Sequence, residues 1–426
     1  MNRPASEGLM RMPPVPSPAP SRKPRGTSSS ESNPSLALDY SSEPCRKSYP
    51  LIVRKDAPYN AEPPLEALVK SVQTPTPHLF VRQHGPVPDL HPDDHTIVFQ
   101  GLGIKHGHVK LSVSDIKNTF EKVETTAVLM CAGNRRDGLQ AVKPVQGVIW
   151  GPGTVGNCRW TGARLCQVLE YCGLPTNPLN RSRALHCAFN SVECCEEDAN
   201  YGSSIPLDKA MDPLGDVLLA YELNGEPLCR DHGAPVRLVV PGFIGARWVK
   251  YLAQVTIQTN ESDAFYQQED YKLLPALVDS HLSAEEWWSK LPAIQEINVQ
   301  SVICYPKSGQ VLPLGPVTIK GYALTGGGRS IERVDVSIDC GETWDVAKLN
   351  NSPCKNLEEG GQGPCWGWSF FEYTVDSLPD GCEIVCRAFD TSQNTQPDRP
   401  LWNYRGVMNN ALFRVKDVIQ REDGKV

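Results

Sequence analysis

The chain has 426 residues, of which 40% are hydrophobic and 21% are charged, and its formal net charge is −7. This length favours two globular domains over one, and the negative charge argues against nucleic acid as a partner, because phosphate binding needs a basic surface. The sequence has no long apolar run and no apolar signal-peptide core, so we expect neither a membrane span nor a cleaved secretory signal.

The first 44 residues differ in composition from the rest of the chain. The stretch MPPVPSPAPSRKPRGTSSSESNPS is rich in proline and serine and has almost nothing apolar to bury. We therefore predict a disordered tail over residues 1–44. Its excess of basic residues is typical of a transit peptide, but its prolines argue against the amphipathic helix that such a peptide needs. The predicted location is intracellular, either cytoplasmic or mitochondrial.

Residues 45–275 mix strands and helices without a regular βαβ repeat. Apolar, β-branched runs predict strands at Thr96–Phe99, Thr126–Met130 and Val236–Val240. Apolar residues at helical spacing predict a helix over Thr161–Cys172, with Thr161 as its N-cap and Gly173 after its end. The mixture predicts an α+β fold rather than a doubly wound sheet.

The pattern of polar and apolar residues changes after Tyr271. Residues 276–300 read as a connection, and residues 301–420 are rich in short alternating strands. Val334, Val336 and Ile338 alternate with polar residues, and the glycines at 326–328 predict a hairpin turn before them. Strands of this kind, separated by Gly, Pro and Asn turns, predict an immunoglobulin-like β-sandwich.

The chain contains 15 cysteines, an odd number spread along its length. Without a secretory signal, reduced thiols are favoured over a disulfide framework. The spacings match neither a zinc finger nor a CxxCH haem attachment.

One cysteine, Cys131, directly follows the strand predicted at Thr126–Met130. It opens the motif CAGNRR, residues 131–136, which places Arg135 and Arg136 close behind it on a glycine-containing loop. Nearby cations favour the thiolate, the form that binds soft metals. Taken alone, the motif is better explained by a buried structural cysteine beside a turn.

Other basic residues interrupt apolar strands and proline-rich turns. They lie in FVRQH (80–84), DHGAPVR (231–237) and GARWVK (245–250). Scattered basic residues are usually solvated surface, but a purely surface charge has less reason to sit at these positions. Together they predict a site for a large anionic cofactor and a small dianion.

With GSSIPLDKAMDP (202–213) and VLLAYELNGEPL (217–228), these motifs make the chain resemble the eukaryotic sulfite oxidase and assimilatory nitrate reductase family. The resemblance implies a molybdopterin-binding catalytic domain over residues 45–275, followed by an immunoglobulin-like dimerisation domain over residues 301–420, and hence a homodimer. It also implies a molybdenum–molybdopterin cofactor whose metal takes the thiolate of Cys131. The implied cofactor-binding residues are Phe80, Val81, Arg82, Gln83, His84, Glu193, His232, Arg237, Trp248, Val249 and Lys250. Glu193 stands where sulfite oxidases typically have aspartate, so its carboxylate is one methylene further out.

The substrate pocket separates the two branches of this family. The positions that match the three arginines, tyrosine and tryptophan of sulfite oxidases are Arg82, Arg136, Arg405, Tyr271 and Trp150. Nitrate reductases usually replace the third arginine with methionine and the tyrosine with asparagine, whereas this chain keeps both in WNYRGVM (402–408) and EDYK (269–272). Sulfite is largely a dianion at neutral pH, so a further guanidinium favours it over nitrate. The segment MNNALFRVK (408–416) resembles nitrate reductases instead, so a nitrate or other oxoanion reductase is the alternative.

Neither haem nor flavin is expected beside the molybdenum cofactor. No histidine precedes His78 and no HPGG motif occurs, which argues against a cytochrome b5-type module. We therefore expect the electrons to pass to oxygen or to a separate acceptor such as a cytochrome. A non-catalytic scaffold is a further alternative, although Cys131 and the three arginines argue against it.

Overall fold

The computed structural model describes residues 38–175, 185–350, 363–379 and 381–422. The predicted disordered tail, residues 1–44, therefore lies mostly outside the described residues. Of its described part, Glu43 contacts the body of the protein, because its carboxylate accepts a hydrogen bond of 2.8 Å from the backbone N–H of Val87.

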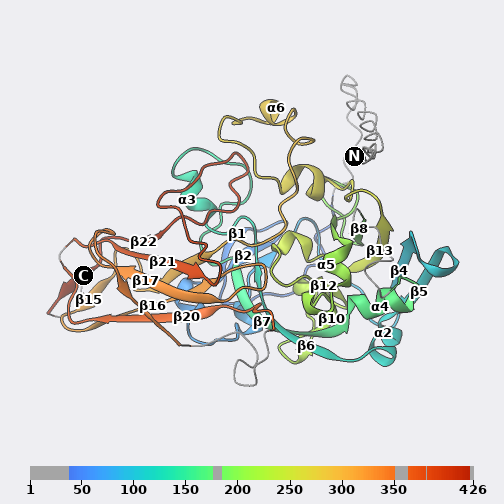
Figure 1. The fold of residues 1–426 in the computed structure, drawn as a ribbon, viewed down its shortest axis with the longest axis horizontal. Helices are drawn as coiled ribbons and strands as arrows, with labels where there is room; N and C mark the ends of the chain where they lie inside the picture. The colour runs from blue at the N-terminus through green and yellow to red at the C-terminus, as the bar shows by residue number, and fades with distance from the viewer. Residues whose placement is uncertain (1–37, 176–184, 351–362, 380, 423–426) are drawn as a thin grey trace, which may run out of the picture. The chain divides into compact units, whose positions relative to one another are not determined.

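Three sheets form the described part of the chain up to Gln258 (Figure 1). The first has the strand order β1–β2–β3, with bounds Ile52–Lys55, Asn60–Glu62 and Val81–Arg82. The second has the order β11–β10–β7–β6, with β12 also paired to β10, and its strands are Glu226–Pro227, Leu218–Leu223, Val155–Arg164, Val123–Met130 and Arg237–Val239. The third has the order β5–β4–β13–β8–β9, with bounds His108–Ser112, Thr96–Gly101, Leu252–Gln258, His186–Ser191 and Gly202–Pro206. Strands β4 and β13 pair in parallel, which fits the mixed α+β class.

Short helices connect and cover these sheets. The α-helices are α1 Leu65–Leu68, α2 Val113–Thr119, α3 Arg136–Gln140, α4 Leu165–Tyr171, α5 Leu207–Met211 and α6 His281–Ala284. The 3-10 turns are η1 Thr76–His78, η2 Lys105–Gly107, η4 Pro213–Gly215, η5 Arg230–His232 and η6 Gly245–Arg247, and η7 Tyr266–Asp270 is a π-helical turn. None of the helices in the described part of the chain has the length and apolarity that a membrane crossing requires.

The strands predicted at Thr96–Phe99, Thr126–Met130 and Val236–Val240 are confirmed in β4, β6 and β12. The start of the predicted helix Thr161–Cys172 is wrong, because α4 begins only at Leu165. Thr161 is a buried residue of β7, opposite Glu124 of β6 and Glu222 of β10, so pairing on both sides outweighs the helical spacing of the sequence. Gly173 does follow the helix, with a φ of +119° that favours glycine.

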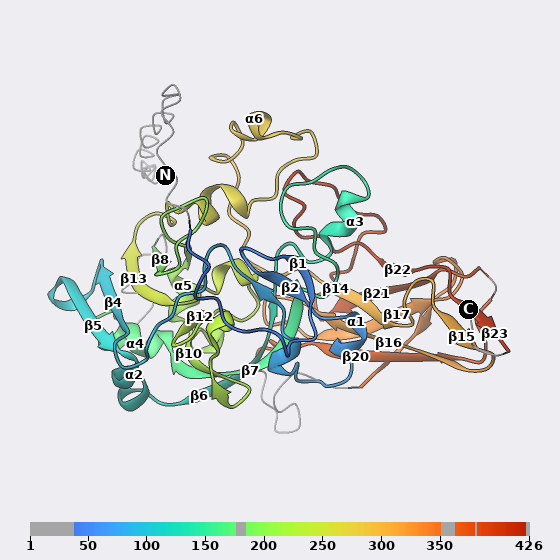
Figure 2. The same cartoon turned by 180° about the vertical axis from the view of Figure 1, so that it is seen from behind.

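From Gln300 the described chain forms a β-sandwich of two four-stranded sheets (Figure 2). One sheet has the order β14–β16–β20–β19, with bounds Gln300–Tyr305, Val317–Leu324, Ser369–Val375 and Lys348–Leu349. The other has the order β18–β17–β21–β22, with bounds Asp345–Val346, Ile331–Ser337, Ile384–Asp390 and Phe413–Val415. A parallel pair, β15 Val311–Pro313 and β23 Ile419–Arg421, lies beside them.

The hairpin predicted at Gly326–Gly328 is wrong. These glycines connect β16 with β17, and β16 pairs with β14 and β20 while β17 pairs with β18 and β21. The turn therefore passes from one sheet of the sandwich to the other. Local glycine content predicts a reversal of the chain but does not determine which strands pair after it.

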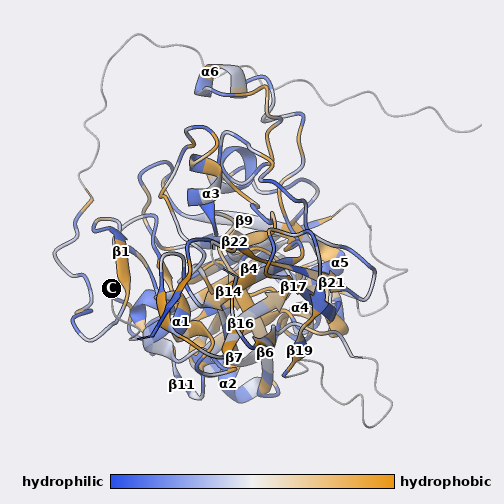
Figure 3. Cartoon of the chain, turned by 90° about the vertical axis from the view of Figure 1, so that its left-hand side faces the viewer, coloured by the Kyte–Doolittle hydropathy of each residue, from blue (hydrophilic) through white to orange (hydrophobic). Residues whose placement is uncertain are grey.

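The core of the preceding sheets extends to a few residues of the sandwich, which also has a separate core of its own, and apolar colour concentrates on strands such as β7, β14 and β16 (Figure 3). The Tyr322 hydroxyl donates to the carbonyl of Pro152 at 3.1 Å, and the Val128 N–H donates to the carbonyl of Trp366 at 2.9 Å. The segment between β21 and β22 also returns to α3 (Figure 1), where the Met408 N–H donates to the carbonyl of Ala132 at 2.8 Å. Residues near the C-terminus are thereby brought beside the CAGNRR loop.

Candidate active site

Cys131 follows the last residue of β6 and is buried. Its N–H donates to the carbonyl of Thr154 at 3.0 Å, and its Sγ accepts a hydrogen bond from the N–H of Gly133 at 3.4 Å. The loop thus fixes the position of a cysteine sulfur at the end of a strand.

The two arginines that follow Cys131 point to different partners. Arg135 has a left-handed φ of +64°, and its guanidinium contacts the side chain of Gln300 and lies 5.1 Å from the ring centroid of Phe413. Arg136 instead donates to the carbonyls of Gly406 at 2.9 Å and Val148 at 2.8 Å. The prediction that both guanidinium groups lie behind Cys131 therefore applies only to Arg136, because the left-handed turn directs Arg135 toward the sandwich.

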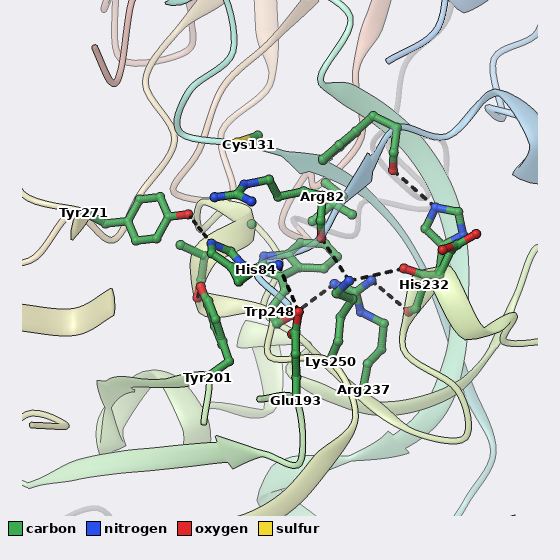
Figure 4. Close-up of a pocket in the computed structure, with 15 residues that line it drawn as sticks. Arg82, His84, Cys131, Glu193, Tyr201, His232, Arg237, Trp248, Lys250 and Tyr271 are labelled. Atoms are coloured by element: carbon green, nitrogen blue, oxygen red, sulfur yellow. Dashed lines mark hydrogen bonds between the residues drawn. The ribbon is translucent and has the colours of Figure 1, made fainter. Parts of the chain in front are cut away.

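A cavity with about 560 Å³ of open space lies directly beside Cys131 (Figure 4). Its lining comes from distant segments of the chain: Phe80, Arg82, His84, Leu129, Cys131, Glu193, Tyr201, Asp231, His232, Arg237, Gly245, Ala246, Trp248, Lys250 and Tyr271. Most of the residues predicted to bind the cofactor are therefore brought to one place. Val81, Gln83 and Val249 are fully buried behind this lining and do not face the cavity.

Arg237 is held in this cavity by carbonyl groups. Its Nη1 donates to the carbonyl of His232 and its Nη2 to the carbonyl of Trp248, both at 3.0 Å. Burial lowers the pKa of Arg237 to about 10. Within the described residues, no carboxylate forms an ion pair with Arg237 at 4.0 Å or less.

Lys250 is held in the same way. Its Nζ donates to the carbonyls of Arg82 at 2.9 Å and Asp231 at 3.3 Å, and it contacts the side chain of Gln83. Burial lowers the pKa of Lys250 to about 8, and in the described chain it too has no carboxylate within 4.0 Å. Gly233, between these cations, has a φ of +101°, and a Cβ there would lie 3.0 Å from the Cβ of Lys250, so glycine allows the two segments to approach.

His84 and Tyr271 meet at the end of the cavity near Cys131. The Nε2 of His84 lies 3.1 Å from the Tyr271 hydroxyl (Figure 4). Burial, with Arg82 and Lys250 nearby, lowers the pKa of His84 well below its usual range, so the imidazole is neutral. Glu193 holds the backbone here, because its Oε1 accepts the N–H groups of His84 at 3.0 Å and Gly85 at 3.2 Å. Burial raises the pKa of Glu193.

A second, more open cavity of about 1040 Å³ adjoins the first through Arg82 and His84, which line both. Its other lining residues are Arg54, Lys55, Pro58, Asn60, Gly147, Val148, Ile149, Glu196, Glu197, Asp270 and Arg405. Arg405 lies against the carboxylate of Asp270. Burial and the nearby Arg136 lower the pKa of Arg405 to about 10.

Arg136 joins two walls of this second cavity without lining it. It bonds to the carbonyls of Val148 on one wall and Gly406, next to Arg405, on the other. Gly147 has a φ of +108°, and a Cβ there would lie 2.6 Å from Nη1 of Arg136. Trp150 is fully buried and lines neither cavity, and its Nε1 has no hydrogen-bond partner among the described residues.

Sequence reasoning missed three residues of the site. Tyr201 lines the first cavity and lies with its ring centroid 4.6 Å from that of His84. Asp231 and Asp270 line the two cavities. The two aspartates directly adjoin the predicted residues His232 and Tyr271, so their positions carried a signal, whereas Tyr201 follows an acidic loop that gave none.

The residues present fit an anionic cofactor that carries a soft metal. Buried cations without carboxylate partners are costly, and bound phosphate would neutralise them. A cysteine sulfur at the same cavity is a suitable ligand for a soft metal. The unpartnered Nε1 of Trp150 and Nε of Arg405 are further buried donors near this region.

Comparison with known proteins agrees with this chemistry. Residues 84–266 match the family model "Oxidoreductase molybdopterin binding domain", and residues 291–421 match "Mo-co oxidoreductase dimerisation domain". The chain is 44% identical to the mitochondrial sulfite oxidase of Homo sapiens, over 88% of this chain and 67% of that protein. It is 42% identical to the sulfite oxidase of Arabidopsis thaliana, over 88% of this chain and 96% of that protein. The fold is similar to the sulfane dehydrogenase SoxCD of Paracoccus pantotrophus, with a TM-score of 0.67 and 26% identity over 85% of each chain.

The fold class expected from the sequence is thus confirmed as a molybdopterin-binding domain followed by a dimerisation domain. Molybdopterin is the cofactor of this family of domains, and the cavity beside Cys131 has the donor groups for it. The chain belongs to the sulfite oxidase family, and it is a molybdopterin oxidoreductase with sulfite-oxidase-like activity.

Proposed function

We propose that this protein oxidises sulfite to sulfate in the two adjoining cavities beside Cys131. One observation carries the proposal. Basic side chains are buried there in two groups, and among the described residues Arg405 alone of these has a carboxylate within 4.0 Å, that of Asp270. The first group is His232, Arg237 and Lys250, and the second is Arg82, Arg136 and Arg405. Two groups of cations suit two anions, a large one that stays and a small one that is turned over.

The first group would hold the phosphate and pterin of the cofactor. Arg237 and Lys250 already present N–H donors fixed by carbonyls, so little further ordering is needed when an anion binds. The proposed contacts also include Phe80–His84, Glu193 and Trp248–Lys250. Cys131 would bind the metal through its thiolate. When bound, the cofactor supplies two-electron redox chemistry and oxygen-atom transfer.

The second group would bind and orient the sulfite dianion. Arg82 faces both cavities, so it can contact a small anion next to Cys131. Arg405 enters from the C-terminal segment, and Arg136 fixes that segment through Gly406. Asp270 competes for Arg405, so anion binding requires Arg405 to share or leave this carboxylate. Bidentate guanidinium contacts then set the orientation of the substrate.

Tyr271 and Trp150 would complete the substrate site. The Tyr271 hydroxyl is directed by neutral His84, and burial raises the pKa of Tyr271, so the hydroxyl keeps its proton and can donate it in a hydrogen bond. A neutral His84 adds no charge, so the arginines alone set the electrostatic preference for a dianion. Trp150 would act from behind the wall formed by residues 147–149.

The proposal extends to the partners of the reaction. Electrons would leave to oxygen or to a separate acceptor, without haem or flavin in this chain. The dimerisation domain supports a homodimer. We also propose an intracellular location, cytoplasmic or mitochondrial. Among the described residues 13 cysteines are free, but Cys365 is disulfide-bonded, so the expectation of reduced thiols is wrong at this position.

A substrate assay tests the proposal. Molybdenum-loaded protein is given sulfite with ferricyanide as electron acceptor, and separately nitrate with a reduced viologen as donor. We expect sulfite-dependent ferricyanide reduction and little nitrate turnover. Nitrate turnover without sulfite turnover would contradict the proposed role of Arg405 and Tyr271 and would favour the oxoanion reductase alternative. Neither activity in metal-loaded protein would favour a scaffold.

A further inference from the structure

Cys229 forms a cysteine–histidine pair at the edge of the first cavity. Its Sγ lies 3.0 Å from the Nδ1 of His232, and the thiol is half-buried rather than enclosed. Cys229 itself does not line the cavity, whereas His232 does. The pair therefore connects a solvent-accessible thiol to a residue of the proposed cofactor site.

The second nitrogen of His232 fixes the direction of proton transfer. Its Nε2 lies 3.2 Å from the carbonyl of Phe80, and a carbonyl only accepts, so Nε2 must carry a proton. In the neutral imidazole, Nδ1 is then the acceptor and faces the thiol. His232 is thus oriented to take the proton of Cys229, which leaves a thiolate beside an imidazolium.

The surroundings favour the thiolate at Cys229 more than at the buried thiols of Cys158 and Cys172. Burial raises the pKa of Cys229, but His232 outweighs burial and lowers the pKa to about 7. By contrast, burial raises the pKa of Cys158 to about 12 and that of Cys172 to about 11. The other groups that face Cys229 are Tyr49, Asp231, Arg237 and Tyr251. Asp231 opposes the thiolate, but its carboxylate is paired with Arg46 at 2.6 Å.

We propose that Cys229 is an oxidation site for small peroxides that acts on the cofactor cavity through His232. The Cys229 thiolate attacks one peroxide oxygen, an S–O bond forms and the O–O bond breaks. The leaving hydroxide takes the proton of the His232 imidazolium and departs as water. Sulfur is oxidised by two electrons to a sulfenic acid, and the peroxide is reduced. His232, which has given up its proton, then faces a larger group in place of the thiolate.

The consequence for the cavity rests on the proposed cofactor role of His232, but the reactivity of Cys229 does not. Oxidation adds an oxygen atom to a sulfur that lies 3.0 Å from the Nδ1 of His232, so the enlarged group displaces His232 from its position in the cavity. The expected result is a thiol whose oxidation lowers retention of the pterin.

The first experiment measures reactivity directly in the cofactor-loaded protein. Iodoacetamide is applied in short pulses from pH 5.5 to 9, and peptide mass spectrometry follows each cysteine. We expect the labelling rate of Cys229 to reach half its maximum near pH 7, and to be about threefold faster at pH 7 than that of a free cysteine peptide. The thiolate fraction is larger by about 15-fold and its intrinsic nucleophilicity is lower by about fivefold. The exposed Cys45 and Cys340 serve as internal controls for reagent access. A midpoint at the ordinary value of a free thiol, about 8.5, would overturn the proposal.

Two variants test whether the reactivity of Cys229 comes from its pairing with His232 or only from its exposure to the reagent. His232→Asn removes the proton acceptor, and the midpoint of Cys229 labelling should rise by about one pH unit or more. Cys229→Ser keeps a hydroxyl donor for His232 and removes the nucleophile, so untreated protein should keep its pterin and its activity. An unchanged midpoint in the His232 variant would show that the histidine does not activate the thiol.

The second experiment applies hydrogen peroxide and traps sulfenic acid with dimedone. We expect the trapped residue to be Cys229, and the treated wild type to lose pterin on gel filtration faster than treated Cys229→Ser protein. Trapping elsewhere, or equal pterin loss in both proteins, would contradict the proposal. These readouts do not depend on sulfite turnover, so failure of the proposed function would show separately, as inactivity of untreated protein.

Discussion

Basic side chains have different partners in the two domains. In the sandwich, arginines pair with carboxylates: Arg329 with Asp390 at 2.8 Å, Arg387 with Asp335 at 3.0 Å, and Arg414 with Glu383 at 2.8 Å. In the cavity of the molybdopterin domain, Arg237 and Lys250 are bound by carbonyl oxygens instead.

This difference distinguishes the arginines that stabilise the sandwich from the cations that we propose bind a ligand. A paired arginine is satisfied within the chain, whereas a carbonyl offers only a partial charge, and the field of Lys250 is only partly compensated by the more distant carboxylates of Glu193 and Asp231. Burial lowers the pKa of both cavity cations, to about 10 for Arg237 and about 8 for Lys250. We therefore propose that the cavity, unlike the sandwich, is arranged to bind an external anion. The predictions that follow test this contrast.

The largest effect should come from Cys131→Ser. If the cavity cations hold the pterin phosphate while the thiolate binds the metal, the variant should keep most of its pterin but lose activity. Loss of an outer ligand partner in metal sites typically costs 10–100-fold, so loss of the ligand itself should exceed about 100-fold. Pterin fluorescence and sulfite-dependent ferricyanide reduction measure the two quantities. The matched control is Cys166→Ser, at a buried thiol on α4, which should keep its activity. If pterin and activity were lost in parallel, Cys131 would instead be a residue that stabilises the fold.

Arg405→Met should have the next largest effect. It removes one charge-assisted contact to substrate, worth about 1.5–3 kcal/mol, so kcat/KM for sulfite should fall about 10- to 150-fold. Pterin content should not change, because Arg405 lines only the second cavity. Steady-state kinetics with sulfite, beside the nitrate assay, provide the measurement. A loss of pterin equal to the loss of kcat/KM would show that the two groups of cations do not bind cofactor and substrate separately.

A pair of apoprotein variants tests the contrast in stability. Arg329→Met leaves Asp390, which is fully buried, without its cation, and should lower the free energy of unfolding by about 2 kcal/mol. Lys250→Met removes an uncompensated cation and should raise the free energy of unfolding of the apoprotein by about 1 kcal/mol. Urea denaturation at pH 7 measures both. If both variants lose stability to the same extent, the carbonyl groups satisfy Lys250 as fully as a carboxylate satisfies Arg329.

The sequence predicted elements better where the signal is local. The strand that ends before Cys131 and the strands of the sandwich were predicted because apolar alternation is a property of neighbouring residues. The helix start at Thr161 was wrong because pairing with β6 and β10 extended the strand, and the turn at Gly326–Gly328 was wrong because its partners are distant in sequence.

The site shows the same limit. The motifs named Arg82, His84, His232, Arg237 and Lys250, and the fold brings all of them to one cavity. The motif did not predict that Arg135 and Arg136 diverge, because this depends on one left-handed residue and on partners beyond residue 290. The contact of Arg405 with Asp270 joins positions 135 residues apart and had no local signal.

The smallest expected effect is a pH dependence of stability that the buried Lys250 contributes. Lys250 has a pKa of about 8 in the folded apoprotein, below its ordinary value of 10.5. Between these values the unfolded chain binds more protons than the folded one, so the stability of the apoprotein should rise with pH in this window. Between pH 8 and 9.5 the free energy of unfolding of the wild type should increase by about 1–2 kcal/mol relative to Lys250→Met, measured by urea denaturation at each pH. With cofactor bound, a phosphate next to Lys250 raises its pKa, and the rise should disappear. Burial also lowers the pKa of Lys209 to about 8, so stability should rise with pH in both proteins, and a rise of equal size in both would mean that Lys250 does not titrate in this window.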